Sequence, residues 1–165
     1  MSCDPTRDPD PRTRLSRRAL LALPLAIGLA SALRAAPASG QTVHLSAGDV
    51  AAGGYDVVAY FTRGEAVRGS RALQARWNGA VWRFSSAESR DAFVADPTRY
   101  APAYGGHCAW AAAENYLAPG DPRHWRIVDG RLFLNFNASV HRRWVGDVHG
   151  NVARADANWP GLAGR

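Results

Sequence analysis

The chain has 165 residues, 47% of them hydrophobic and 21% charged, and its formal net charge is +6. This length fits one modest domain plus an extension. Every strongly basic side chain is an arginine, and the arginines are scattered rather than clustered. The composition therefore excludes a nucleic-acid-binding surface built on a basic patch.

The N-terminal extension has the pattern of an export signal. An apolar run from Ala19 to Leu33 is followed by Ala36-Pro37-Ala38, which fits a small-x-small cleavage site. The run is too short for a comfortable membrane span, and Arg17-Arg18 precedes it as in a twin-arginine signal. We therefore predict a signal peptide over residues 1–38, a periplasmic or secreted protein, and no stable membrane anchor after cleavage.

Cleavage at this site would remove Cys3 and leave Cys108 as the single cysteine of the mature protein. A lone cysteine in an oxidising compartment can form no internal disulfide. It is then buried, bound to a ligand, or available for pairing with a partner protein.

Residues 39–53 are predicted to be a linker with one short strand around residues 42–45, and residues 54–162 one domain. The clearest element of that domain is a hairpin over residues 73–84, because Asn78-Gly79 favours a tight two-residue turn. Such a turn places Trp77 opposite Ala80, Ala75 opposite Trp82 and Leu73 opposite Phe84. A helix follows, with Ser85 and Glu88 as its predicted capping box, and it ends near Asp96-Pro97.

A second hairpin is predicted over residues 125–136, with its turn at Asp129-Gly130. Its register places Leu132, Leu134 and Phe136 on the apolar face, and Phe133 and Asn135 on the opposite face. Asn137 is predicted to cap a helix, and a last helix spans about 151–159, where Pro160 ends it. The fold class is therefore α+β, with small antiparallel β-hairpins packed with short helices.

A constant offset of 51 residues relates FVAD (93–96) to WVGD (144–147), which hints at an internal duplication. The two hairpins disagree in which residues they turn inward, however. The pattern alone therefore does not establish a repeat.

The segments GYDVVAYF (54–61) and WNGAVWRFSSAESRDAFVADPTRYAPAYGGHCAWA (77–111) resemble the YHS domain family. The likeness covers about residues 54–160 and is closer to an exported group of that family. It implies a YHS or treble-clef-like core with a C-terminal hairpin-helix extension. Metal-associated members carry cysteines where this chain has Ala59, Ser85 and Ser89, so their metal site does not carry over.

Cys108 and His107 are the first candidate site, because a thiolate and an imidazole together suit copper or zinc. Neighbouring side chains diverge in regular structure, so a shared ion requires an irregular turn at Gly105-Gly106. The alternatives are a buried cysteine that packs as a small hydrophobe, and a reactive thiol with His107 as its base.

Further candidates for the wall of a ligand pocket are Asp56, Tyr60, Tyr104 and Trp110. Asp56 lies in an otherwise apolar segment, where a buried carboxylate either lines a pocket or caps a turn. The other five tryptophans fall on predicted core stripes, which argues against an aromatic carbohydrate platform. They are Trp77, Trp82, Trp125, Trp144 and Trp159.

Three functions follow from these patterns. The favoured hypothesis is an exported soluble binding protein that holds a transition metal or a small ligand near Cys108. The second is a non-catalytic structural or interaction module that has lost the family's metal thiols and docks to a protein partner. The third, a thiol enzyme, has the least support, because the sequence contains no GxSxG, HExxH, P-loop or dinucleotide-binding motif.

Overall fold

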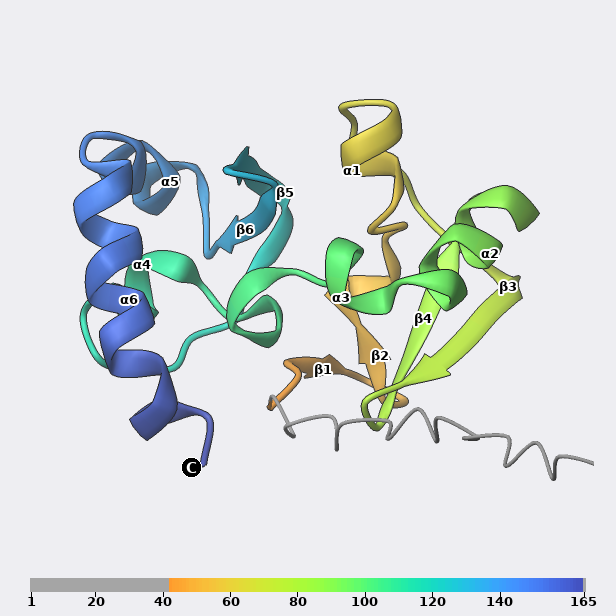
Figure 1. Cartoon of the computed structure of the whole chain (residues 1–165), viewed down its shortest axis with the longest axis horizontal. Helices are drawn as coiled ribbons and strands as arrows, with labels where there is room; N and C mark the ends of the chain where they lie inside the picture. The colour runs from red at the N-terminus through yellow and green to blue at the C-terminus, as the bar shows by residue number, and fades with distance from the viewer. Residues whose placement is uncertain (1–41, 165) are drawn as a thin grey trace, which may run out of the picture. The chain divides into compact units, whose positions relative to one another are not determined.

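The computed structural model describes residues 42–164 (Figure 1). The predicted signal peptide, residues 1–38, lies outside the described residues and stays a prediction. Within the described part of the chain, no helix combines the length and the apolar character that a membrane crossing requires.

The described chain is a mixed α+β structure, as predicted. In chain order its elements are β1 (Leu45–Ser46), β2 (Val50–Ala51), the 3-10 helix η1 (Ala52–Gly54), α1 (Ala59–Thr62), β3 (Ser70–Trp77), β4 (Ala80–Phe84), α2 (Ala87–Ala95), α3 (Pro97–Tyr100), the 3-10 helix η2 (Ala103–Gly106), α4 (Ala109–Ala113), β5 (Asp121–Val128), β6 (Arg131–Asn135), α5 (Ala138–Val145) and α6 (Val148–Leu162).

The first hairpin forms at its predicted turn. Asn78 and Gly79 both have positive φ, at 50° and 74°, as this two-residue turn requires. Trp77 pairs with Ala80 and Ala75 with Trp82, which confirms the predicted register. Farther from the turn the prediction is wrong: an irregularity between Ser70 and Gln74 brings Ser70, rather than Leu73, opposite Phe84.

Part of the predicted linker joins the first hairpin in a four-stranded sheet. Its strand order is β1-β2-β4-β3, and β2 pairs in parallel with β4 through Val50 and Val81. Val50 and Ala51 are only 4% and 1% exposed. The short strand predicted around residues 42–45 overlaps β1 at Leu45, whereas β2 was not predicted, because a strand of two residues is too short to show an alternating pattern.

The predicted N-cap is displaced by one residue, and the predicted capping box does not form. Ser86, not Ser85, caps α2 by accepting a hydrogen bond from the Ser89 N–H at 3.1 Å. Ser85 instead bonds to Asp56. Asn137 caps α5 as predicted, because its side chain accepts a hydrogen bond from the Val140 N–H at 2.9 Å.

The second hairpin turns at Asp129-Gly130 as predicted, and Ile127 pairs with Leu132. The predicted faces are only partly right, because β6 is buried on both sides. Phe133 is 1% exposed and Asn135 is 0% exposed, whereas Phe136 is 50% exposed. This burial comes from tertiary packing. The helices of the C-terminal half cover the face of the hairpin that the sequence pattern predicts to be exposed to solvent.

Alternate residues of β6 enter two different cores. Leu132 and Leu134 pack with Phe84, Phe93 and the other buried residues around β4 and α1. Phe133 packs with Trp144 and with buried residues of α4 and α6. Helix α6 continues through Pro160 to Leu162, beyond its predicted end, and Leu162 is buried in this second core.

The two halves of the domain repeat the same arrangement (Figure 1). Elements η2, β5, β6, α5 and α6 each begin 51 residues after η1, β3, β4, α2 and α3. The caps repeat too: Ser86 and Asp96 cap α2 and α3, and Asn137 and Asp147 cap α5 and α6 at the same offset. We call residues 52–100 the first repeat and residues 103–162 the second repeat.

Candidate functional site

Cys108 is buried, 1% exposed, at the N-terminal end of α4. Its sulfur accepts a hydrogen bond from the Phe136 N–H at 3.3 Å and lies 3.9 Å from Asn135 Oδ1. Neither partner is a base. The thiol therefore has the contacts of a packed, buried side chain.

His107 directs its ring to other partners. Its Nδ1 lies 2.9 Å from the Tyr104 carbonyl oxygen, and its ring packs edge-on against His44 with the ring centroids 5.2 Å apart. Burial lowers the pKa of His107 and, together with the charge of His107, that of His44. The irregular backbone at Gly105 serves a close approach, because a Cβ there would overlap the Thr42 carbonyl.

The described residues offer no complete metal-ligand set. Within residues 42–164, no group of three or more His, Cys, Asp or Glu side chains is arranged to hold an ion. His107 and Cys108 bond to different neighbours rather than to a common point. The arrangement thus gives no geometric support to the predicted metal site.

Asp56 connects two elements of the first repeat. It is 0% exposed, and its Oδ1 accepts hydrogen bonds from the N–H groups of Val58 and Ala59 at 3.0 and 3.3 Å. Its Oδ2 accepts from the Ser85 N–H at 2.9 Å and from the Ser85 hydroxyl at 2.6 Å. Asp56 therefore fixes the start of α1 to the end of β4, and it does not line a pocket.

Tyr60 also has a connecting role. Its hydroxyl donates to the Pro122 carbonyl at 2.8 Å, and its ring packs against Trp125. Burial raises the pKa of its phenol above the ordinary value. The side chain joins the two repeats and is not available to a ligand.

Trp110 lies beside a buried polar group that the sequence analysis did not select. Asn135 Oδ1 accepts a hydrogen bond from the Trp110 N–H at 3.3 Å, and Asn135 Nδ2 lies 3.3 Å from His141 Nδ1. Cys108, Asn135 and His141 thus form a row with the amide in the middle. The imidazole contacts the amide rather than the sulfur, so this row does not activate a thiol.

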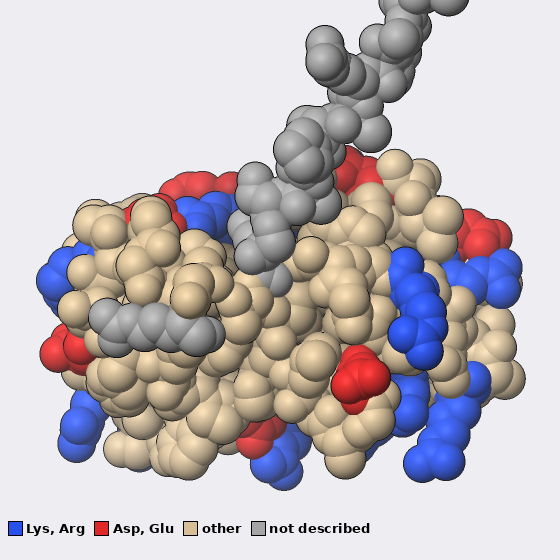
Figure 2. All heavy atoms as spheres, turned by 90° about the horizontal axis from the view of Figure 1, so that it is seen from below, with Lys and Arg blue, Asp and Glu red and all other residues tan. Residues whose placement is uncertain are grey.

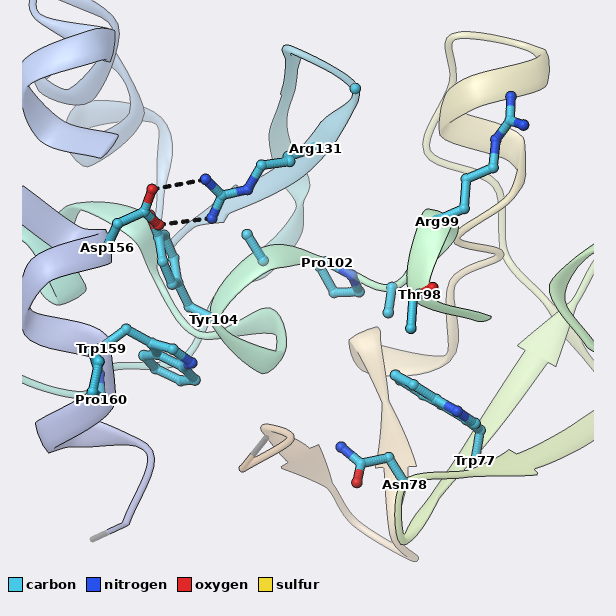
Figure 3. Close-up of a pocket in the computed structure, with 13 residues that line it drawn as sticks. Trp77, Asn78, Thr98, Arg99, Pro102, Tyr104, Arg131, Asp156, Trp159 and Pro160 are labelled. Carbon is cyan, nitrogen blue, oxygen red and sulfur yellow. Dashed lines mark hydrogen bonds and ion pairs between the residues drawn. The ribbon is translucent and has the colours of Figure 1, made fainter. Parts of the chain in front are cut away.

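Tyr104 is the predicted pocket residue that does line a cavity. A groove of about 460 Å³ lies between the first and the second repeat (Figure 3). Trp77 and Asn78 border it on the side of the first repeat, and Tyr104, Arg131 and Trp159 on the side of the second. We refer to this cavity as the inter-repeat groove.

An ion pair forms the polar wall of the inter-repeat groove (Figure 3). Arg131 Nη1 and Nη2 donate to Asp156 Oδ2 and Oδ1 at 2.9 and 2.8 Å, and the Tyr104 hydroxyl donates to Asp156 Oδ1 at 2.9 Å. Hydrogen bonding to Arg131 lowers the pKa of Asp156, and burial with the bond to Asp156 raises that of Tyr104. The wall carries both charges in paired form.

A second, more open hollow of about 390 Å³ is lined by Arg68, Arg123 and Phe136, among others. Its arginines are engaged: Arg123 bonds to Asp121, and Arg68 lies over the ring of Tyr55. On the face shown in Figure 2, arginine side chains gather towards one end with acidic side chains among them, and uncharged residues cover most of the rest.

Sequence reasoning missed Arg131, Asp156 and the position of Trp159 in the groove. Arg131 and Asp156 are 25 residues apart in the chain and meet only when α6 packs beside the second hairpin. Trp77 and Trp159 were both assigned to core stripes, and each packs against a core, but both are half-buried and line the cavity. The argument against an aromatic carbohydrate platform therefore fails for these two tryptophans. No local signal distinguishes a core tryptophan from one at the edge of a groove.

Comparison with known proteins returned no family model, no curated protein and no solved structure that matches this chain.

Proposed function

We propose that this chain is an exported, non-catalytic binding protein of the YHS type, and that it holds a small organic ligand in the inter-repeat groove. The observation that carries the proposal is the groove itself. Its volume of about 460 Å³ falls within the range of roughly 300–1,000 Å³ common to small-molecule sites. Its wall combines aromatic rings with a few convergent polar groups, which is the usual composition of such sites.

The proposal extends the YHS resemblance, because the groove is not lined by Ala59, Ser85 or Ser89, the positions where metal-associated members keep their thiols. The treble-clef-like core would correspond to the first repeat, and the second repeat would supply the C-terminal extension. Copper or zinc binding at Cys108 and His107 has less support, since the sulfur and the imidazole are bonded to different neighbours.

The proposal is tested by filling the groove. Thr98 is exposed and lines the cavity, so Thr98→Trp would occupy it without disturbing the core. Val94→Trp is the matched control, because it adds the same indole at a position of α2 that is 60% exposed and outside the groove.

Protein purified from the periplasm is screened against a small-molecule library by thermal shift, and hits are confirmed by calorimetry. We expect ligands that bind the wild type and Val94→Trp equally and Thr98→Trp at least about tenfold more weakly. No hit in the library, with a partner protein co-purifying instead, would favour the interaction module. Stoichiometric metal that is lost in Cys108→Ser would favour the metal site.

A further inference from the structure

The polar wall of the inter-repeat groove is neutral but rich in hydrogen-bonding groups. Arg131 and Asp156 form a two-bond pair, yet their side chains remain 42% and 45% exposed. The guanidinium of Arg131 has further N–H groups that these two bonds do not use. Asp156 Oδ2 accepts one hydrogen bond, from Arg131 Nη1, and can accept another. Donors and an acceptor therefore stand side by side within reach of a ligand.

The aromatic sides of the groove are held from behind by other rings. Trp77 packs against Trp82 and Phe93, with a centroid distance of 5.9 Å to each. Trp159 packs against Tyr104 and His107 at 5.4 and 5.8 Å. Both indoles are only half-buried and lie on opposite sides of the cavity (Figure 3). Rings that are already immobilised lose little entropy when a ligand covers them.

This combination discriminates between classes of ligand. An anion needs an unpaired cation, but Arg131 is paired with Asp156, and the side chain of Arg99 extends away from Trp77 and Trp159 (Figure 3). A purely apolar ligand would cover the exposed groups of the ion pair without giving them partners, which is unfavourable. The ligand must therefore offer apolar faces together with neutral groups that both donate and accept.

We propose that the ligand of the inter-repeat groove is a neutral saccharide, of mono- or disaccharide size. This inference rests on the proposed function and adds to it the class of ligand. The C–H faces of a sugar ring would stack on Trp77 or Trp159, and adjacent hydroxyls would bond to Arg131 and Asp156. Each hydroxyl is both a donor and an acceptor, which matches the mixed wall.

The test is a binding panel of small sugars that differ in net charge. Glucose, maltose and cellobiose are the neutral probes, glucuronate is the anionic probe and glucosamine the cationic one. Binding is followed by tryptophan fluorescence and calorimetry on the full mature chain. For the wild type we expect saturable binding of at least one neutral sugar, with glucuronate and glucosamine at least about tenfold weaker.

Two variants should shift this preference in opposite directions. Asp156→Asn leaves the charge of Arg131 unpaired, so the neutral sugar should bind about tenfold more weakly and glucuronate should gain. Arg131→Gln leaves Asp156 unpaired and should favour glucosamine. Asp91→Asn is the matched control, because it removes one partner of an exposed ion pair with Arg90 outside the groove and should change nothing.

The outcomes separate the two proposals. Tighter binding of glucuronate or glucosamine than of any neutral sugar, or library hits that include no saccharide, would overturn the saccharide inference and leave the groove as a ligand site. Sugar binding that is equal in the wild type and in Thr98→Trp would place the site elsewhere and overturn the inference as well. No binding of any small molecule would overturn both. Circular dichroism and a thermal melt establish that each variant is folded.

Discussion

Replacing Asp56 by Asn tests whether this buried carboxylate holds the first repeat together. The side chain is 0% exposed and accepts four hydrogen bonds, three of them from backbone N–H groups. An amide has only one oxygen, so in Asp56→Asn its NH₂ group must face either the Ser85 N–H or those of Val58 and Ala59. At least one buried donor is then left unsatisfied.

The magnitude follows from three contributions. An unsatisfied buried donor costs about 1–3 kcal/mol, and each remaining bond weakens by roughly 1 kcal/mol when its acceptor loses its charge. Removing a buried charge offsets part of this loss. We therefore expect Asp56→Asn to lower the free energy of unfolding by about 2–4 kcal/mol, a large fraction of the 5–15 kcal/mol or so of a typical domain.

The assay is urea denaturation followed by tryptophan fluorescence, with Asp147→Asn as the control. Asp147 is an exposed helix cap that accepts one hydrogen bond, from the Gly150 N–H at 3.0 Å, and forms an exposed ion pair with Arg154 at 3.6 Å. Asparagine caps a helix as well as aspartate does, and an exposed ion pair contributes little. The control should lie within about 1 kcal/mol of the wild type. If Asp56→Asn lies equally close, with an unchanged m-value, the connecting role assigned to Asp56 is wrong.

Further expectations concern the thiol, a close-packed glycine, a helix cap and the histidines. Cys108 should react with a disulfide reagent no faster than the protein unfolds; rapid reaction under native conditions would contradict its burial and revive the thiol-enzyme hypothesis. Gly120→Ala should destabilise strongly, because a Cβ there would lie 2.7 Å from a side-chain atom of β6, whereas Gly161→Ala meets open space and should be close to neutral in the same urea assay. Asn137→Ala should cost about 1 kcal/mol in urea denaturation, as the loss of a helix cap usually does. Burial lowers the pKa of His107, so the unfolded chain takes up a proton more readily than the folded one once the pH falls below about 6.5. Stability should therefore decline on acidification below that pH, and His107→Gln should make the decline shallower; an unchanged slope would show that other groups carry it.

Local chemistry was enough to predict both hairpins. A two-residue turn at Asn78-Gly79 or Asp129-Gly130 sets the pairing of the residues next to it, without any help from the rest of the molecule. The prediction failed where distance from the turn allowed an irregularity, between Ser70 and Gln74. Register information is therefore local, and it fades along the strand.

Burial depends on what packs against an element, and this is where pattern reasoning failed. Phe133 and Asn135 were placed on a solvated face, yet α4, α5 and α6 cover that face. Trp77 and Trp159 were placed in the core, yet both pack only at its edge and border the groove. Among the predicted pocket residues only Tyr104 lines that groove, because Arg131 and Asp156 meet through tertiary packing that no sequence window contains.

The repeat explains why the lone cysteine occupies its position. In the first repeat, the Asp56 N–H bonds to the Val67 carbonyl, and Asp56 Oδ2 receives the Ser85 N–H after β4. In the second repeat, the Cys108 N–H bonds to the Ala118 carbonyl at 2.9 Å, and its sulfur receives the Phe136 N–H after β6.

Cys108 is thus the counterpart of Asp56, with a weaker acceptor. Its offset from Asp56 is 52 rather than 51, because η2 has four residues where η1 has three. A side chain that holds a helix start to a strand end in both repeats has a structural reason to be there without any ligand. The groove has no such explanation, because its two sides come from different parts of the two repeats: Trp77 from a strand end, and Trp159 and Asp156 from α6. The polar and aromatic side chains of the groove are therefore not explained by the repeat. A ligand should be sought at the Arg131–Asp156 pair rather than at the Cys108 thiol.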